Sequence, residues 1–155
     1  MAWKNWRDEV PKVSVQFTCC DLKGRTRGQK HVLFRLVDPM IVTREDTGET
    51  LDLAAGFLSD GSSVPGALWG GLTADPADLL LPGFAHDYAY RRGAAWTKPN
   101  GTRRELDRYQ ADLVHIALCR RLKVRKSDQE KIFFALRVAG GFAYRRRDLG
   151  WDGSD

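Results

Sequence analysis

Long apolar stretches are missing from this 155-residue sequence. It has no run of about 18 apolar residues, so we expect no membrane-spanning helix. Residues 1–9 carry two tryptophans among charged residues and lack the apolar core of a signal peptide. We therefore expect the protein in the cytoplasm at synthesis, which leaves room for later packaging into a particle.

Cysteine is scarce. The sequence has three, Cys19, Cys20 and Cys119, an odd number with two adjacent members. This pattern argues against a disulfide framework and is typical of reduced thiols. A Cys-Cys pair without a second pair is also a poor metal site, and we interpret it as two small strand residues.

Acidic side chains are fewer than basic ones: the sequence has 20 acidic and 25 basic side chains, and its formal net charge is +5. The surplus favours an anionic partner, such as a lipid head-group surface, nucleic acid or an acidic protein surface. However, no stretch interleaves aromatic and basic residues as a nucleic-acid reader does, so we expect no specific nucleic-acid reading. A hydrophobic content of 43% and a length of 155 residues are typical of one soluble globular domain.

Hydrophobic periodicity predicts strands in the first third of the chain and helices in the second half. Alternation of apolar and polar residues indicates strands at residues 13–17, 31–37, 40–43 and 51–53. Helices are expected from Pro82 to about Gly93, over residues 102–122, and after a capping box at Ser127 and Glu130. Gly140 and Gly141 are expected to stop or kink the last helix.

We therefore predict an α+β fold in a single domain of residues 1–155, with a small N-terminal antiparallel β-sheet followed by a bundle of about three helices. Its expected parts are a β-rich part (1–55), a glycine- and proline-rich loop region (56–82), a helical part (83–147) and a polar tail (148–155).

The adjacent pair His86-Asp87 is the strongest candidate for chemistry. On a helix, His86 and Tyr90 share one face, four residues apart, while Asp87 points about 100° away. A histidine aimed at one target and a carboxylate aimed at another suit a base that works beside a bound cation. The alternative is a buried contact between His86 and Tyr90 with a solvated Asp87.

A glycine-rich loop precedes this helix at residues 56–66. Its Asp60-Gly61 step favours a tight turn that exposes backbone carbonyls, and an aspartate with such carbonyls could hold a hard cation. The alternative is a plain connection in which Ser62 and Ser63 cap the following segment. A serine nucleophile is not expected, because the Gly-x-Ser-x-Gly pattern is absent.

Two aspartates of the predicted helix at residues 102–122 are candidates to pair with His86. On a helical wheel, Asp107 falls inside the apolar face, whereas Asp112 lies nearer the edge of that face. A buried carboxylate needs a partner, so Asp107 is the better candidate. His115 is flanked by Arg108 on the wheel, and we expect it to face solvent.

Three segments together resemble an uncharacterised family of tailed phages, prophages and bacteria. They are Ser59-Asp60-Gly61-Ser62-Ser63, then His86-Asp87 followed by Tyr90-Arg91, then the helix that carries Asp107. The resemblance covers roughly residues 30–145. It implies a phage origin, synthesis in the host cytoplasm and incorporation into a virion, and it implies no activity.

The same segments are similar, more distantly, to the catalytic core of the bacterial and fungal phospholipases A2. That resemblance implies a phospholipase A2-like helix bundle in which His86 is the base that activates water and Asp107 holds its other nitrogen. It also implies Ca²⁺, with Asp87, Asp60 and the carbonyl of Gly61 as ligands. In the phospholipases, cysteines tie the loop to the helix, and here Ser62 and Gly83 stand in those places.

Three functions follow as hypotheses. The first is a phage-related, Ca²⁺-dependent, phospholipase A2-like ester hydrolase that acts on an anionic phospholipid membrane of the host. The second is a structural or assembly protein of a phage tail or neck, which binds other phage structural proteins and has an inherited, inactive site. The third is a metal-dependent hydrolase of a peptidoglycan amide, which the lack of a second histidine near His86 in the sequence disfavours for zinc.

Overall fold

The structure is a computed structural model, and it describes residues 5–18, 20–24, 33–59, 71–74 and 76–145. In chain order the strands are β1 (Val13–Gln16), β2 (Cys20–Gly24), β3 (Leu33–Leu36), β4 (Met40–Arg44), β5 (Thr50–Leu53), β6 (Leu58–Ser59), β7 (Ala95–Thr97) and β8 (Arg103–Glu105). The helical elements are α1 (Trp6–Glu9), the 3-10 turn η2 (Pro76–Leu79), α2 (Leu80–Arg91), α3 (Arg108–Arg121) and α4 (Lys126–Arg145). The predicted α+β class is confirmed.

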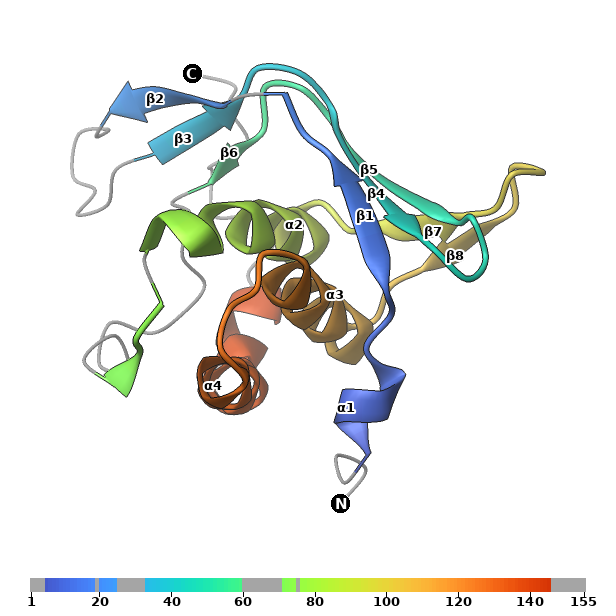
Figure 1. Cartoon of the computed structure of the whole chain (residues 1–155). Coiled ribbons are helices and arrows are strands. Elements are labelled where there is room, and N and C mark those ends of the chain that lie inside the picture. Colours follow the sequence, from blue (N-terminus) through green and yellow to red (C-terminus); the bar gives the residue numbers. More distant parts are fainter. Residues whose placement is uncertain (1–4, 19, 25–32, 60–70, 75, 146–155) are drawn as a thin grey trace.

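The strands form two antiparallel sheets on one side of the molecule (Figure 1). The larger sheet has the order β1-β4-β5-β7-β8, and the smaller has the order β2-β3-β6. In β5 the alternation seen in the sequence is also seen in space, because Leu51 and Leu53 are buried and Asp52 is exposed. The sheet therefore presents an apolar face to the helices and a polar face to solvent.

One predicted boundary is wrong. The helix expected from residue 102 begins at Arg108, and residues 95–105 form the β-hairpin of β7 and β8. The turn of this hairpin contains Gly101 with a φ of 87°, a conformation that favours glycine. The side chain of Asp107 then caps α3 by accepting from the amide of Gln110, so the helix has a defined start after the hairpin.

Helix α4 also differs from its prediction. It begins at Lys126 and continues through Gly140 and Gly141 to Arg145, so these glycines do not end the helix.

Among the described residues, no helix combines the length and the apolarity that crossing a membrane requires.

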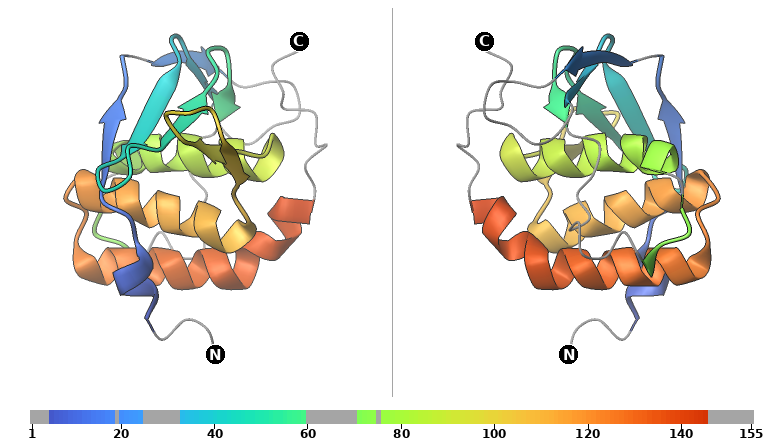
Figure 2. Two further views of the ribbon diagram at one scale, coloured as in Figure 1. Left: turned by 90° about the vertical axis from the view of Figure 1, so that its right-hand side faces the viewer. Right: turned by 90° about the vertical axis from the view of Figure 1, so that its left-hand side faces the viewer.

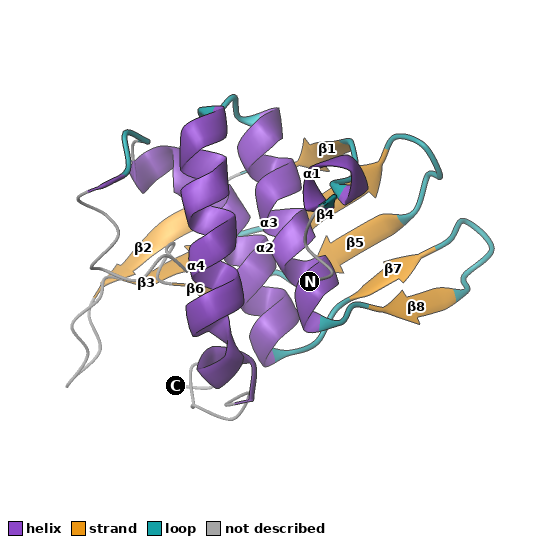
Figure 3. Ribbon diagram, turned by 90° about the horizontal axis from the view of Figure 1, so that it is seen from below, coloured by secondary structure: helices purple, strands orange, loops and turns teal. Residues whose placement is uncertain are grey.

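The three long helices stack beneath the strands, in the order α2, α3, α4 (Figure 2). The view from below shows α4 in front, with α2 and α3 behind it and the strands farthest away (Figure 3). Helix α3 packs against α2, α4 and β1, and every residue from 111 to 119 is buried. This position makes α3 the central helix, with no solvent-facing side over those residues.

Candidate functional site

A buried hydrogen bond joins α2 to α3. His86 Nε2 lies 2.8 Å from Oδ1 of Asp112, and the exposed fractions of the two side chains are 3% and 0%. Because the Asp112 carboxylate lies between α2 and α4 on the central helix, it can be reached from both sides. The structure thus brings together two of the residues that the sequence singled out.

Two further side chains complete the surroundings of Asp112. Tyr90, one turn after His86, donates its hydroxyl to the same Oδ1 at 2.5 Å. Arg137 of α4 donates Nη1 to Oδ2 at 2.8 Å. Burial by itself would raise the pKa of Asp112, but hydrogen bonds from His86, Tyr90 and Arg137 outweigh it and hold this pKa below its ordinary range. Asp112 is therefore an ionised carboxylate whose two oxygens both accept hydrogen bonds.

Asp107, the preferred partner of His86 in the sequence, does not reach it. Its exposed side chain accepts from the amide of Gln110 at 2.8 Å, and the Gln110 side chain accepts from the Asp107 amide in return. The helical wheel placed Asp107 inside the apolar face because it began the helix at residue 102. With the helix starting at Arg108, Asp107 is the N-cap and Asp112 lies in the interior.

His115 was expected to face solvent, and that expectation is wrong. Its side chain is 1% exposed, and its ring lies edge-on to that of His86, with centroids 5.3 Å apart and planes at 90°. Neither ring nitrogen has a hydrogen-bond partner among the described residues, although the main chain of Pro82 lies near enough to favour the protonated ring slightly. Burial, followed by repulsion from His86, lowers the pKa of His115 to about 3, so this imidazole is neutral.

Asp87 lies on another side of α2, next to strand β6. Its Oδ2 accepts from the hydroxyl of Ser59 at 2.6 Å and from Nη2 of Arg91 at 2.9 Å. Arg91 also donates Nη1 to the carbonyl of Leu58 at 3.0 Å. The sequence prediction that His86 and Asp87 point to different targets agrees with these contacts.

Of the three expected calcium ligands, the structure describes the surroundings of Asp87. Calcium takes six to eight oxygen ligands, and Asp87 is the one expected ligand within the described residues, since Asp60 and Gly61 lie outside them. The carboxylate of Asp87 already pairs with the guanidinium of Arg91, whose charge opposes a cation. The described part of the chain also contains no group of three or more histidine, cysteine or acidic residues that could hold a metal ion.

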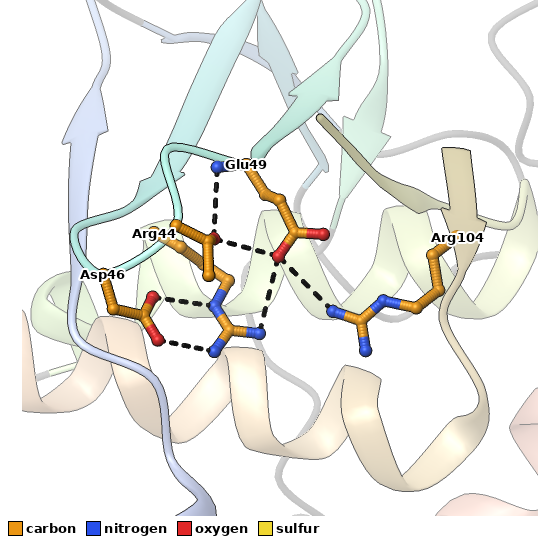
Figure 4. Close-up of polar contacts among 5 residues, drawn as sticks. Arg44, Asp46, Glu49 and Arg104 are labelled. Carbon is orange, nitrogen blue, oxygen red and sulfur yellow. Dashed lines mark hydrogen bonds and ion pairs between the residues drawn. The ribbon is translucent and has the colours of Figure 1, made fainter. Parts of the chain in front are cut away.

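A second polar cluster lies at the turn between β4 and β5 and includes Arg104 of β8. Glu49, only 4% exposed, accepts from the Thr47 hydroxyl at 2.9 Å and lies between the guanidinium groups of Arg44 and Arg104, at 3.8 and 3.5 Å (Figure 4). Arg44 also pairs with Asp46. Two neighbouring cavities of about 260 and 400 Å³ border Arg44, and neither is lined by His86 or Asp112.

Sequence reasoning missed Arg137 and the true surroundings of His115. Arg137 is a basic residue late in an amphipathic helix, and such residues usually face solvent. Tyr90 was placed correctly on the face of His86, because their four-residue spacing fixes that relation. The contact of Arg137 with Asp112 could be predicted only if the side of α4 that packs against α3 were known.

The fold and the site define an α+β protein with a buried histidine–aspartate pair held by three helices. The chain belongs to a family described as "Protein of unknown function (DUF1353)", whose model matches residues 34–136. This range contains His86, Asp87 and Asp112 and ends one residue before Arg137. No curated protein and no solved structure matches the chain significantly.

Proposed function

We propose that this protein is a phospholipase A2-like ester hydrolase in which His86 activates the attacking water. The observation that carries the proposal is the buried 2.8 Å hydrogen bond between His86 Nε2 and Asp112 Oδ1. An ionised carboxylate only accepts hydrogen bonds, so Nε2 bears the proton. In a neutral imidazole the lone pair is then on Nδ1, which is the atom that can accept a proton.

The reaction follows from this tautomer. Nδ1 of His86 takes a proton from water as the water oxygen attacks the ester carbonyl, and the Asp112 carboxylate stabilises the imidazolium that forms. The tetrahedral intermediate then collapses, and His86 returns the proton to the departing alcohol. Calcium enters no step here, because Asp60 and Gly61, two of its three expected ligands, lie outside the described residues.

The substrate class is argued from charge and from sequence motifs. A net charge of +5 supports an anionic phospholipid surface as the partner. The motifs around Asp60 and His86 support a phage-related protein that is carried in the virion and acts on the host membrane. Together these features suggest phosphatidylglycerol as a first substrate to test.

A second candidate is favoured by the burial of the pair. His86 is 3% exposed and Asp112 is fully buried, as expected of a polar contact that holds helices together. On this alternative the protein is a structural or assembly component of a phage tail or neck, and it binds other phage structural proteins. The two candidates differ in one measurable property, which is turnover.

The deciding experiment measures fatty-acid release from phosphatidylglycerol vesicles. For a hydrolase, we expect His86→Ala to lower the rate by about 10²- to 10⁴-fold, because the general base is lost. The matched control is Asp107→Ala, which removes an exposed helix cap and should leave the rate unchanged. Equal background release from the wild-type protein and His86→Ala would support the structural candidate instead.

A further inference from the structure

The turn between α3 and α4 is strongly basic. No acidic residue occurs in the sequence between Asp112 and Asp128. Four basic side chains at this turn are exposed, and within the described ranges none of them pairs with an acidic side chain: Arg121, Lys123, Arg125 and Lys126. These four residues form the basic turn. Because their charges are not neutralised by neighbours, this end of α4 attracts anions.

Helix α4 also exposes two apolar side chains. Phe134 and Val138 are each 61% exposed, and their four-residue spacing places them on one face of the helix. Lys131, three positions before Phe134, is exposed on the same side, and its Nζ donates to the carbonyl of Gly71 at 2.6 Å. An exposed apolar pair with a polar rim is typical of a surface that contacts another molecule.

The apolar pair and the basic turn border the same side of the molecule. Helix α4 is the outermost of the three stacked helices, and the strands lie on the far side of the stack (Figure 2, Figure 3). Phe134 follows Lys126 by eight positions, which is about 12 Å along the helix axis. Lysine and arginine side chains are long enough to bring their charges toward the plane of such an apolar pair. A flat anionic surface laid along α4 can therefore meet both features.

This combination selects among anionic partners. Nucleic-acid phosphates would bind the basic turn but leave Phe134 and Val138 in water. A second copy of the chain would cover the apolar pair but would bring together two molecules that each carry a net charge of +5. A bilayer of anionic lipids offers both a negative head-group layer and an apolar boundary beneath it. We propose that the outer side of α4, with Phe134, Val138 and the basic turn, is the surface through which this protein docks on an anionic lipid bilayer.

This inference rests on the proposed function for its lipid partner, but its test needs no turnover. The full chain is sedimented with vesicles of ether-linked phosphatidylglycerol, which has no carboxylic ester to cleave, and with vesicles of ether-linked phosphatidylcholine. We expect binding to phosphatidylglycerol to be at least about tenfold tighter, because the basic turn attracts anionic head groups. Added salt should weaken this binding, since it screens exposed charges.

Two double variants separate the contributions of charge and apolar contact. Arg125→Glu with Lys126→Glu reverses two charges of the basic turn. Phe134→Gln with Val138→Gln removes the apolar pair and keeps a good helix former at both positions. We expect each double variant to bind phosphatidylglycerol vesicles at least about tenfold more weakly than the wild-type protein. All four side chains are exposed, so the fold should be kept.

Matched controls make the same kinds of change away from α4. Lys98→Glu with Arg103→Glu reverses two exposed charges on the hairpin of β7 and β8, which extends away from α4 (Figure 1). Val37→Gln replaces an apolar side chain that is 44% exposed and lies outside α4. Both controls should bind as the wild-type protein does. Equal binding to the two lipids, or unchanged binding in either α4 variant, would overturn the proposal.

Other occupants of this surface would give other results. A wild-type dimer in sedimentation velocity that Phe134→Gln with Val138→Gln converts to a monomer would assign the apolar pair to a second copy and overturn the lipid assignment. Binding of single-stranded DNA in place of phosphatidylglycerol, lost in Arg125→Glu with Lys126→Glu, would overturn it as well.

Ester-linked phosphatidylglycerol then separates this proposal from the proposed function. If the protein docks on these vesicles as expected but releases no fatty acid, the proposed function fails while the docking surface stands. If fatty acid is released at an unchanged rate by both α4 variants, the hydrolase stands and the docking surface fails.

Discussion

Two aspartates five positions apart in the sequence have opposite surroundings. Asp107 is exposed and closes the first turn of α3 through Gln110, whereas Asp112 is buried and ionised beside His86 and Arg137. Their chemistry is the same, so the difference comes entirely from where the helix begins. At the scale of single residues, the start of α3 decides which carboxylate can serve the histidine.

The buried neutral His115 should make stability depend on pH. Its pKa is lowered to about 3 in the folded state from 6.5, so between these values the unfolded chain binds more protons. The free energy of unfolding should therefore fall as the pH falls from 6.5 toward 3, with a slope of up to about 1.4 kcal/mol per pH unit. Urea unfolding at several pH values measures this slope.

The comparison variant is His115→Phe, which keeps a ring of similar shape but cannot bind a proton. Its pH dependence should be flatter than that of the wild-type protein by the contribution of this one residue. Identical slopes in the two proteins would contradict a buried, neutral His115. Acidic residues such as Asp112 and Asp128, whose pKa values are lowered, contribute equally to both proteins and cancel.

The pairing of Asp87 with Arg91 leads to a prediction about calcium. Because a guanidinium already neutralises Asp87, we expect the thermal midpoint of the wild-type protein to be the same with chelator and with about 1 mM calcium, a concentration that fills weak sites. Arg91→Gln removes the competing charge and should introduce stabilisation by calcium. Strong stabilisation of the wild-type protein would instead indicate that the loop at Asp60 and Gly61 completes a calcium site.

At the scale of elements, the helices and strands that could be predicted from the sequence are those determined by residues close together in the chain. The alternation in β4 and β5 and the turn at Gly48, with a φ of 72°, are set by residues close in the chain. Likewise α2 ends just before Gly93, whose φ is 72°. These features could be predicted because their causes lie within a few positions of them.

Features that depend on packing were missed. Arg103, Arg104 and Glu105 are good helix formers by propensity, but they pair with β7 instead, so tertiary contact overrode local preference. His115 was assigned to a solvent face because wheels assume one, whereas α3 is covered by α2, β1 and α4. The sequence therefore predicted that the partner of His86 is Asp107 or Asp112, and the packing of the helices determines that it is Asp112.

The turn between α3 and α4 contains a residue other than glycine, Lys123, with a left-handed backbone conformation. Lys123 has a φ of 60°, and the amides of Val124 and Lys123 bond the carbonyls of Cys119 and Arg120, the pattern that glycine usually completes. We expect Lys123→Gly to raise the free energy of unfolding by up to about 1 kcal/mol, because glycine adopts this φ without a steric penalty.

The control for this change is Arg121→Gly in the exposed last turn of α3. There the backbone is helical, so glycine should lower stability by about 1 kcal/mol. Both values come from urea unfolding at neutral pH. A loss of stability in Lys123→Gly similar to that in Arg121→Gly would contradict the role assigned to the left-handed backbone at Lys123.

At the scale of the whole molecule, the N-terminal segment holds the outermost helix in place. Trp6 of α1 is 7% exposed and stacks on Phe133 of α4, with ring centroids 4.1 Å apart. Arg7 pairs with Glu130 of α4 at 2.6 Å, and Arg120 of α3 donates to the carbonyl of Arg7. These contacts join the start of the described chain to its last helix.

Trp6→Ala should therefore lower the free energy of unfolding by about 3 to 5 kcal/mol, as is usual for a buried tryptophan. Arg7→Ala, in the same segment, removes an exposed ion pair and should cost less than about 1 kcal/mol. Denaturant unfolding of both variants measures the difference. A small effect of Trp6→Ala would mean that α1 is not part of the cooperative unit.

The position of Arg137 also has a consequence for the order in which the protein is made. The partners of Asp112 come from residues 86, 90 and 137, and a ribosome delivers the first two well before the third. A nascent chain that ends before α4 holds the histidine and its carboxylate without the guanidinium. The contact between His86 and Asp112 can therefore form before the ion pair between Asp112 and Arg137, which needs residue 137.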